Sequence, residues 1–86
     1  INICTTKIFI EKVKMTINYQ EEIKFISNKI RELRKEKQMT VQELAYRCDM
    51  ERSNMSRIES GRTNLTVKTM CIICNALNVN LRDIIR

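Results

Sequence analysis

Cysteines are the residues of this chain whose type and spacing could most directly support chemistry. The sequence contains four of them (Cys4, Cys48, Cys71 and Cys74) and no histidine. The spacing Cys71-x-x-Cys74 occurs in zinc sites and in redox-active pairs. A zinc site would need two more ligands, and only Cys4 and Cys48 remain to supply them. A redox pair is expected at a helix N-terminus beside a βαβ pattern, which this sequence lacks.

The surroundings of the Cys71-x-x-Cys74 pair favour a structural role. The pair lies inside an apolar run with helical spacing, where residues three apart share one face. Free cysteine commonly packs in protein cores as a small apolar residue. We therefore expect buried, reduced thiols, with a redox pair and a metal site as the less favoured alternatives. Reduced thiols are typical of the cytoplasm, which is the expected location. No metal and no other cofactor is predicted.

The sequence offers no recognisable catalytic arrangement. Without histidine, the commonest general base and activator of nucleophiles is missing. No carboxylate pair, glycine-rich phosphate loop or nucleophile elbow is present. An enzyme is therefore not expected. The chain also lacks an apolar run of about 18 residues, so no membrane partner is predicted, and nothing indicates a small-molecule ligand.

The segment from Thr40 to Gly61 predicts two short helices joined by a tight turn. Thr40 is a favourable N-cap for the first of these helices. The second helix is predicted over Arg52–Ser60, followed by Gly61 at the position of a left-handed C-cap. The small Ala45 would allow the two helices to approach closely where they cross. This arrangement is that of a helix-turn-helix unit, which reads DNA with its second helix.

Over Arg31–Ile84 the chain resembles the lambda-repressor/Cro-type helix-turn-helix domain, also called the XRE family. The resemblance is carried by Arg34 and by the runs Thr40–Ala45, Met55–Gly61 and Ala76–Val79. It implies an all-α fold, a compact bundle of five helices with a helix-turn-helix. It also implies that the second helix of the motif enters the major groove of double-stranded DNA.

Two positions depart from the family pattern. Val41 occupies the place of a glutamine that usually touches a phosphate, and Asp49 replaces the usual glycine of the turn. Aspartate tolerates a left-handed backbone better than most residues, so we expect the turn to be retained. The phosphate contact is not expected from Val41.

The outward face of the predicted reading helix has hydrogen-bonding groups that match base edges. Arg52 and Arg57 can each donate two hydrogen bonds to guanine O6 and N7. Asn54 can pair with adenine N6 and N7, and Ser53 can contact either base. The resemblance matches Arg52, Ser53 and Arg57 to base-contacting positions, whereas Asn54 follows from its amide alone. The alternative interpretation is an ordinary solvated helix face.

Phosphate anchoring is expected from two segments beside the reading helix. The helix after Thr40 presents free backbone N–H groups and the positive end of its dipole. The polar loop after Gly61 resembles a second backbone-gripping segment of the family. Such contacts fix register and account for the salt-sensitive part of affinity. The predicted phosphate contacts are Thr40, Gln42, Arg47, Arg62, Thr63 and Asn64.

The resemblance further implies an ion pair between Arg34 and Glu59. A partly buried glutamate without a cation would be costly, so pairing is the expected solution. We interpret this pair as structural, because it would link the first helix of the domain to the reading helix and orient the latter.

Three more helices are predicted around the motif, over residues 18–36, 67–77 and 81–85. Asn18, Thr66 and Asn80 have N-cap character at their starts. Residues 18–86 are thus assigned to the DNA-binding domain, and residues 1–17 to an N-terminal extension. The β-branched, partly alternating segment 7–17 predicts a strand, and Met15 could be an alternative start of translation.

Self-association is suggested by apolar residues that a small bundle cannot all bury. Ile84 is expected to face the core with Leu81, which leaves Ile85 on another face. Ile72, on the helix 67–77, could contribute to the same exposed side. We therefore predict a homodimer with Ile72 and Ile85 in its interface, the alternative being scattered surface hydrophobes.

The functional interpretation is a sequence-specific, double-stranded DNA-binding transcriptional regulator that reads two half-sites as a dimer. The formal net charge of +6, from 16 Lys+Arg and 10 Asp+Glu, is compatible with a polyanionic partner. The small size resembles the restriction–modification controllers most, with phage-type repressors and antitoxins as further possibilities. The alternative class is a protein-interaction module or antitoxin-type protein that uses the same fold to bind a partner.

Overall fold

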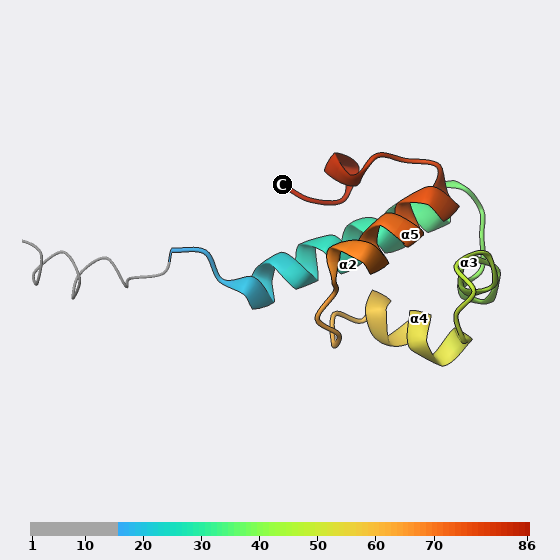
Figure 1. The fold of residues 1–86 in the computed structure, drawn as a ribbon, viewed down its shortest axis with the longest axis horizontal. Helices are drawn as coiled ribbons and strands as arrows, with labels where there is room; N and C mark the ends of the chain where they lie inside the picture. Colours follow the sequence, from blue (N-terminus) through green and yellow to red (C-terminus); the bar gives the residue numbers. More distant parts are fainter. Residues whose placement is uncertain (1–15) are drawn as a thin grey trace, which may run out of the picture.

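The computed structural model describes residues 16–86 as a helical bundle (Figure 1). The described residues contain four α-helices, one short 3₁₀ helix and no strand, which confirms the all-α class. The strand predicted over 7–17 falls mostly outside this part of the chain. The elements are α2 (Tyr19–Glu36), α3 (Val41–Arg47), α4 (Arg52–Glu59), α5 (Val67–Leu77) and η1 (Leu81–Asp83).

The predicted fifth helix, 81–85, is wrong in type and length. Its residues form the 3₁₀ turn η1, in which the N–H groups of Asp83 and Ile84 donate to the carbonyls of Asn80 and Leu81. The Asp83 carboxylate accepts a hydrogen bond from the Asn80 N–H at 2.8 Å. This local capping signal was read correctly. The 3₁₀ helix ends after a single turn, however, and the next residue, Ile84, is fully buried.

Three α-helices begin at a residue whose side chain caps them. The Asn18 Oδ1 accepts from the N–H of Gln20 at 2.9 Å at the start of α2. Thr40 Oγ1 accepts from the Glu43 N–H at 3.0 Å, and Thr66 caps α5 in the same way. Each cap satisfies a donor that the first turn of a helix leaves free. These starts were all predicted from the sequence.

Between residues 16 and 86, helix ends and turns use the left-handed backbone at four places. Gly61 (φ 77°) and Asp49 (φ 57°) do so where the sequence predicted a left-handed C-cap and a turn, and Asn78 (φ 59°) does so at the end of α5. A Cβ at Gly61 would meet only ordinary contacts, so its positive φ is what favours glycine. Gln38 (φ 56°) was not predicted. It reverses the chain so that Met39 becomes buried before α3 begins.

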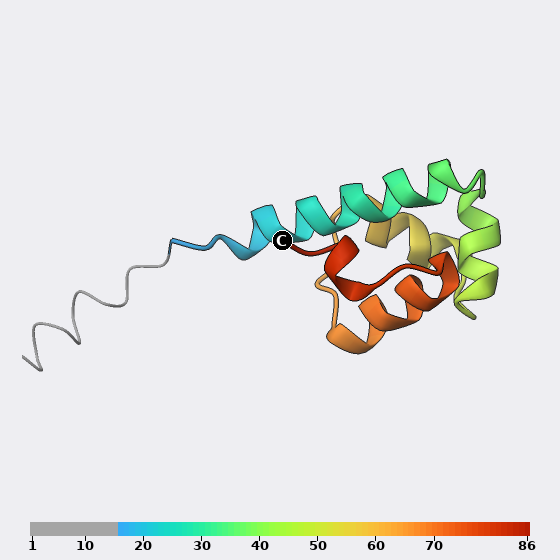
Figure 2. The same cartoon turned by 90° about the horizontal axis from the view of Figure 1, so that it is seen from above.

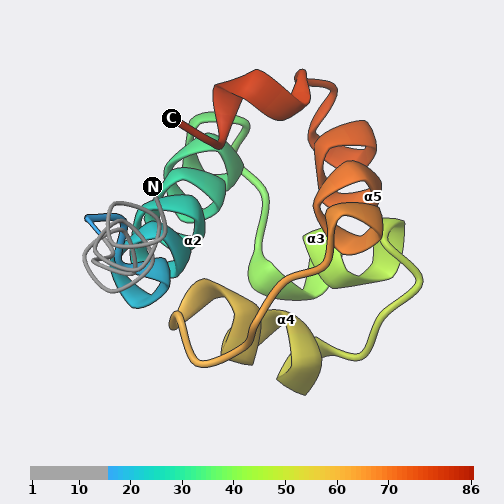
Figure 3. The same ribbon diagram turned by 60° about the vertical axis from the view of Figure 1, so that its left-hand side comes forward.

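The core lies between α2 on one side and α5 on the other, with α3 and α4 closing the bundle (Figures 2 and 3). Helix α4 packs against both α3 and α2, while α5 packs against α3, α2 and η1. Every α-helix and the residue after η1 contribute a fully or almost fully buried side chain. These central residues are Ile30, Leu44, Met55, Ile58, Ile73, Leu77 and Ile84.

The thiols divide between core and surface. Cys48 and Cys74 are buried, as predicted, but Cys71 is exposed. The expectation of a buried thiol is therefore wrong for Cys71, because the helical turn of α5 places it on the solvent side of its neighbour Cys74. Cys4 lies outside the described residues. Within 16–86, no group of three or more potential metal ligands lies together.

The end of the chain folds back on the beginning of α2. The Arg86 guanidinium donates to both carboxylate oxygens of Glu22, at 3.2 and 3.3 Å. It also lies 4.6 Å from the centroid of the Phe25 ring, in a cation–π contact. Phe25, which lies off the apolar stripe of its helix, is thus covered by Arg86. None of the helices between residues 16 and 86 has the length and apolar character of a membrane crossing.

Candidate nucleic-acid interface

Helices α3 and α4 form a tight helix-turn-helix. The N–H of Met50 donates to the carbonyl of Ala45 at 2.9 Å, which closes the end of α3 onto the connection. Ala45 itself is buried where the two helices meet. Asp49 takes the left-handed conformation that the turn requires. The sequence prediction of two short helices around this turn is correct, with α4 ending one residue earlier than expected.

The predicted ion pair between Arg34 and Glu59 is present and buried. Arg34 Nε lies 2.7 Å from Glu59 Oε2, and Arg34 Nη2 lies 3.1 Å from Oε1. The remaining guanidinium nitrogen, Nη1, donates to the Met39 carbonyl at 2.7 Å. Both partners are less than 10% exposed, so each compensates the other's loss of hydration. One side chain of α2 thereby joins the start of the α3 segment to the end of α4.

A second arginine of α2 also binds the end of α4. Arg31 Nη2 donates to the backbone carbonyl of Glu59 at 2.6 Å. That carbonyl belongs to the last turn of α4, where intrahelical donors are missing. No role was predicted for Arg31 from the sequence, although it lies three residues before Arg34 and therefore on the same side of α2. Together the two arginines fix the C-terminal end of α4 against α2.

The outer face of α4 contains the four predicted base-contacting residues. Arg52, Ser53, Asn54 and Arg57 are all exposed, whereas the opposite face of the helix is buried. No side chain in residues 16–86 forms an ion pair with Arg52 or Arg57. Their hydrogen-bond donors are therefore free for an external ligand. The structure brings these four residues together on one surface, and their contact with DNA stays a prediction.

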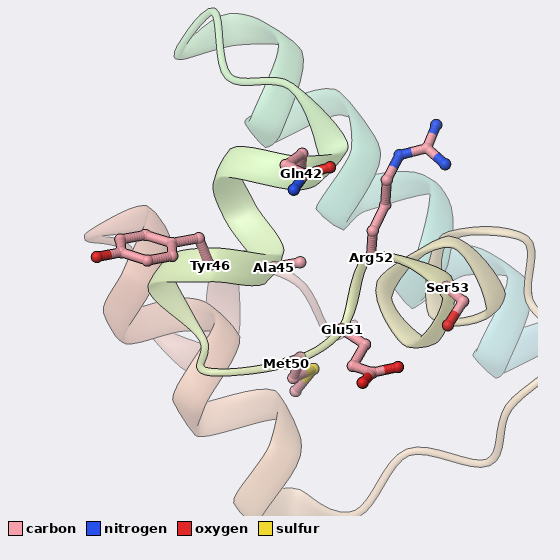
Figure 4. A pocket seen from close by; sticks show the side chains of 7 residues that line it. All are labelled: Gln42, Ala45, Tyr46, Met50, Glu51, Arg52 and Ser53. Carbon is pink, nitrogen blue, oxygen red and sulfur yellow. The ribbon is translucent and has the colours of Figure 1, made fainter.

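A pocket of about 410 Å³ lies between α3 and the start of α4 (Figure 4). It includes two predicted base-contacting residues and one predicted phosphate contact. Three of its other residues, Tyr46, Met50 and Glu51, were not predicted to have a role in binding. Tyr46 is the most exposed large hydrophobic side chain within residues 16–86, at 83%. The lining residues are Gln42, Ala45, Tyr46, Met50, Glu51, Arg52 and Ser53.

The candidate phosphate contacts on α3 differ in how available their polar groups are to an external phosphate. Thr40 is exposed, but its hydroxyl oxygen already accepts the capping hydrogen bond from Glu43. Gln42 is exposed and lines the pocket. Arg47 forms a half-exposed ion pair with Glu43 at 3.1 Å, one helical turn away. Such a pair is weak, so a phosphate could replace the carboxylate.

The loop after α4 presents two of its three predicted phosphate contacts. Arg62 and Asn64 are exposed. The Thr63 hydroxyl is buried and has no hydrogen-bond partner in the described residues. A phosphate contact through this hydroxyl would require the side chain to rotate outward. The Arg62 N–H donates to the Arg57 carbonyl, which ties the loop to the reading helix.

The two predicted interface isoleucines are not equally exposed. Ile85 is 40% exposed, as a surface residue should be. Ile72 is half-buried and packs against the core, so it is less exposed than expected. The turn of α5 places Ile72 beside the buried Ile73 instead of on the opposite face. Ile85 is therefore the better candidate for a contact with a second copy.

Comparison with known proteins agrees with this geometry. Residues 30–84 match the model of a helix-turn-helix family, HTH_3. No curated protein sequence matches the chain significantly. Among solved structures, the restriction–modification controller protein C.Esp1396I is 36% identical, with a TM-score of 0.65 over 67% of this chain and 75% of its own.

Two further solved structures share the fold at lower identity. The restriction–modification controller C.AhdI from Aeromonas hydrophila is 23% identical, with a TM-score of 0.71 over 74% of this chain and 97% of its own. The clp gene regulator ClgR from C. glutamicum is 24% identical, with a TM-score of 0.70 over 72% of this chain and 80% of its own. At these identities the likeness is one of fold.

Proposed function

Because this chain belongs to the XRE-type helix-turn-helix family of DNA-binding transcriptional regulators, we propose that it regulates transcription by reading a specific double-stranded DNA sequence with α4. The observation that supports this most is the contrast between the two faces of α4. The inner face is held by the core and by the buried Arg34–Glu59 pair. The outer face carries donors and acceptors with no partner in the described residues.

The proposed base contacts follow from the chemistry of each side chain. Arg52 and Arg57 would each donate two hydrogen bonds to a guanine. Asn54 would pair with an adenine, and Ser53 would contact either base. The rigid attachment of α4 matters here, because bidentate contacts require a fixed distance between the helix and the base edges.

The proposed phosphate contacts flank the reading helix on both sides. On one side lie Gln42, Arg47 and the first turn of α3, and on the other side lie Arg62 and Asn64. Two anchors across the groove would fix the register of α4, while the base contacts would specify sequence. We include Thr40 and Thr63 with their segments, although the hydroxyl of each is less available than its position suggested.

We propose that the protein binds as a homodimer. One α4 contacts only a few base pairs, so a second copy would raise both affinity and specificity. Two reading helices about 34 Å apart would fit successive major grooves on one side of the duplex. Ile85 would lie in the interface, with Ile72 supporting it from the core. The 36% identity to the controller protein C.Esp1396I supports a controller-type regulator as the biological setting.

Selection of bound duplexes from a random pool tests this function. We expect an enriched sequence with two half-sites in inverted orientation, about one helical turn apart. Failure of the folded protein to enrich any sequence would contradict the proposal and favour the partner-binding alternative.

Sedimentation of Ile85→Lys tests the dimer. Burying an isoleucine side chain fully stabilises an interface by about 1.5–3 kcal/mol, and each such residue counts twice in a symmetric dimer. We expect the variant to stay folded, to dissociate at micromolar concentration and to bind the selected duplex more weakly. Ile85→Leu is the matched control and should keep the dimer. Equal association of all three proteins would place the interface elsewhere.

A further inference from the structure

Helix α4 begins without the side-chain cap that the other three α-helices use. Asn18, Thr40 and Thr66 each accept a hydrogen bond from a backbone N–H of the first turn. Glu51 holds the same position before α4, with φ −77° and ψ 150°, but its carboxylate accepts no such bond. A capping serine, threonine or aspartate would stabilise the helix by about 1 kcal/mol. The capping position is thus occupied by a residue whose side chain leaves the first-turn N–H groups of α4 without a capping hydrogen bond.

The Glu51 carboxylate also has no cationic partner among the described residues. The ion pairs within residues 16–86 involve four other glutamates, namely Glu22, Glu32, Glu43 and Glu59. The neighbouring Arg52 extends in a different direction, as Figure 4 shows. An ionised carboxylate is purely a hydrogen-bond acceptor. Glu51 therefore presents a free acceptor on the same surface as the predicted base contacts.

The pocket adds a second feature beside this carboxylate. Glu51 lines it together with Arg52 and Ser53, which belong to the proposed reading face. Ala45 and Met50 line the same pocket and are apolar. A ligand placed here would meet a hydrogen-bond acceptor and an apolar surface within one small volume. The pocket is thus suited to a flat group with an N–H donor next to a C–H edge.

From this arrangement we infer that Glu51 is a further specificity-determining residue, which selects a cytosine by accepting a hydrogen bond from its N4 amino group. This inference rests on the proposed function, since it names the base that one part of the same surface recognises. Met50 provides most of the apolar surface for the C5 edge of the pyrimidine, because Ala45 beside it is almost fully buried. The contact adds one selected base pair to each half-site.

The other bases fit this pocket less well. Thymine and guanine present carbonyl oxygens to the major groove, and these would repel the carboxylate. Adenine offers an N6 donor, but its N7 acceptor lies next to that donor. Cytosine combines an N4 donor with a C–H group at C5. Glutamate accepting from cytosine N4 is an established type of base contact.

A carboxylate at this place also acts by exclusion. Glu51 adds negative charge to a surface that must approach phosphates, so it lowers affinity for any duplex. That cost is largest where no cytosine compensates it. The residue therefore separates correct from incorrect sequences partly by weakening the incorrect complexes. Removal of its charge should raise non-specific affinity and lower discrimination at the same time.

Glu51→Gln tests the inference, because the amide keeps the shape, removes the charge and adds a donor. Random duplex pools are selected in parallel with the wild-type protein and the variant, and binding is then measured on duplexes with each of the four bases at each half-site position. For the wild type we expect one position where cytosine is preferred over thymine about tenfold or more. In Glu51→Gln, that preference should fall to about threefold or less at this position only. Affinity for non-specific duplexes should rise.

Asp49→Asn is the matched control. It removes one negative charge two residues earlier, outside the pocket, and asparagine tolerates the left-handed backbone of this site. We expect a similar rise in non-specific affinity with the cytosine preference unchanged. Identical base preferences in the wild type and Glu51→Gln would overturn the inference while leaving the proposed function intact. If the wild type enriches no sequence, the proposed function fails and the inference fails with it.

Discussion

Helices α3 and α4 have similar lengths but are stabilised in different ways. Helix α3 has its own local interactions, the Thr40 cap and the Glu43–Arg47 pair along its surface. Helix α4 has no side-chain cap, and no ion pair on its outer face is formed within residues 16–86. It is held by other elements instead, through its buried face and through Arg31 and Arg34 of α2.

This difference separates the requirements of stability from those of binding. Residues that stabilise α3 lie partly on its surface, where they limit what that surface can do. The residues that fix α4 lie underneath it, so its outer face is free to carry hydrogen-bonding groups. The consequence is that substitutions on the two sides of α4 should affect different properties.

The largest loss of stability is expected from breaking the buried ion pair between Arg34 and Glu59. Arg34→Met would leave the Glu59 carboxylate buried without a cation, which should cost about 3–5 kcal/mol of unfolding free energy. Urea denaturation measures this loss. Glu43→Gln, which breaks the exposed pair of α3, should cost less than about 1 kcal/mol. If both variants lose the same stability, the proposed contrast between the helices is wrong.

A double variant sharpens that result. When Arg34→Met is combined with Glu59→Leu, no uncompensated charge remains in the core. Part of the lost stability should return, because apolar pairs often replace buried ion pairs at little cost. No recovery would mean that the Arg34 bond to the Met39 carbonyl, not the ion pair, accounts for the effect.

Arg57→Ala tests the other face of α4. The change should remove about 1–3 kcal/mol of discrimination at one base pair per half-site. Thermal stability should remain close to that of the wild type, because Arg57 is exposed and forms no ion pair in residues 16–86. Competition binding with specific and non-specific duplexes provides the measurement. Equal weakening on both duplexes would identify Arg57 as a phosphate contact.

Thr40→Ala and Glu51→Ala compare the two N-caps directly. The first should lower the unfolding free energy by about 1 kcal/mol, because the Glu43 N–H loses its acceptor. The second should have a much smaller effect, since Glu51 makes no capping bond. Urea denaturation of both variants is sufficient. A loss of about 1 kcal/mol in Glu51→Ala would show that its carboxylate does cap α4 in solution.

The smallest effect is expected from alkaline pH. Burial raises the pKa of Cys48 and Cys74 above that of a free thiol, and for Cys74 the charges of Cys71 and Asp83 add to this. Above the ordinary thiol pKa, the unfolded chain loses these protons while the folded protein keeps them. The contribution to stability is therefore complete below the ordinary pKa and is lost as pH rises through the raised pKa. Denaturation at several alkaline pH values gives the unfolding free energy as a function of pH. This free energy should fall less steeply with pH for Cys74→Ala than for Thr40→Ala, because Thr40→Ala keeps both buried thiols.

The parts of the fold that were predictable depend on neighbours in sequence. The caps at Thr40 and Thr66 and the reversals at Asp49 and Asn78 need only a suitable side chain at the right place. The type of η1 and the left-handed Gln38 depend on which apolar residue must enter the core next, Ile84 or Met39. That requirement comes from the packing of distant helices, which no local pattern contains.

The candidate site likewise has one part that the local sequence predicts and another that depends on tertiary packing. The four residues on the outer face of α4 follow from helical periodicity and from the family resemblance. The pocket does not, because it exists only after the turn has set α3 against the start of α4. Glu51 and Tyr46 look like ordinary surface residues in the sequence. Glu51 directly precedes Arg52, but the pocket that it shares with Tyr46 of α3 emerges only in the tertiary structure.

The buried ion pair between Arg34 and Glu59 should also affect the rate at which the protein unfolds. The two charged partners are separated by 25 residues, and the guanidinium contacts groups before α3 and at the end of α4. These contacts need α2, α3 and α4 to be in place, so they should form late during folding. Stabilising contacts that are absent from the transition state slow unfolding and leave folding almost unchanged. Stopped-flow kinetics of Arg34→Met should accordingly show faster unfolding at a nearly constant folding rate, so this ion pair would lengthen the lifetime of the native state.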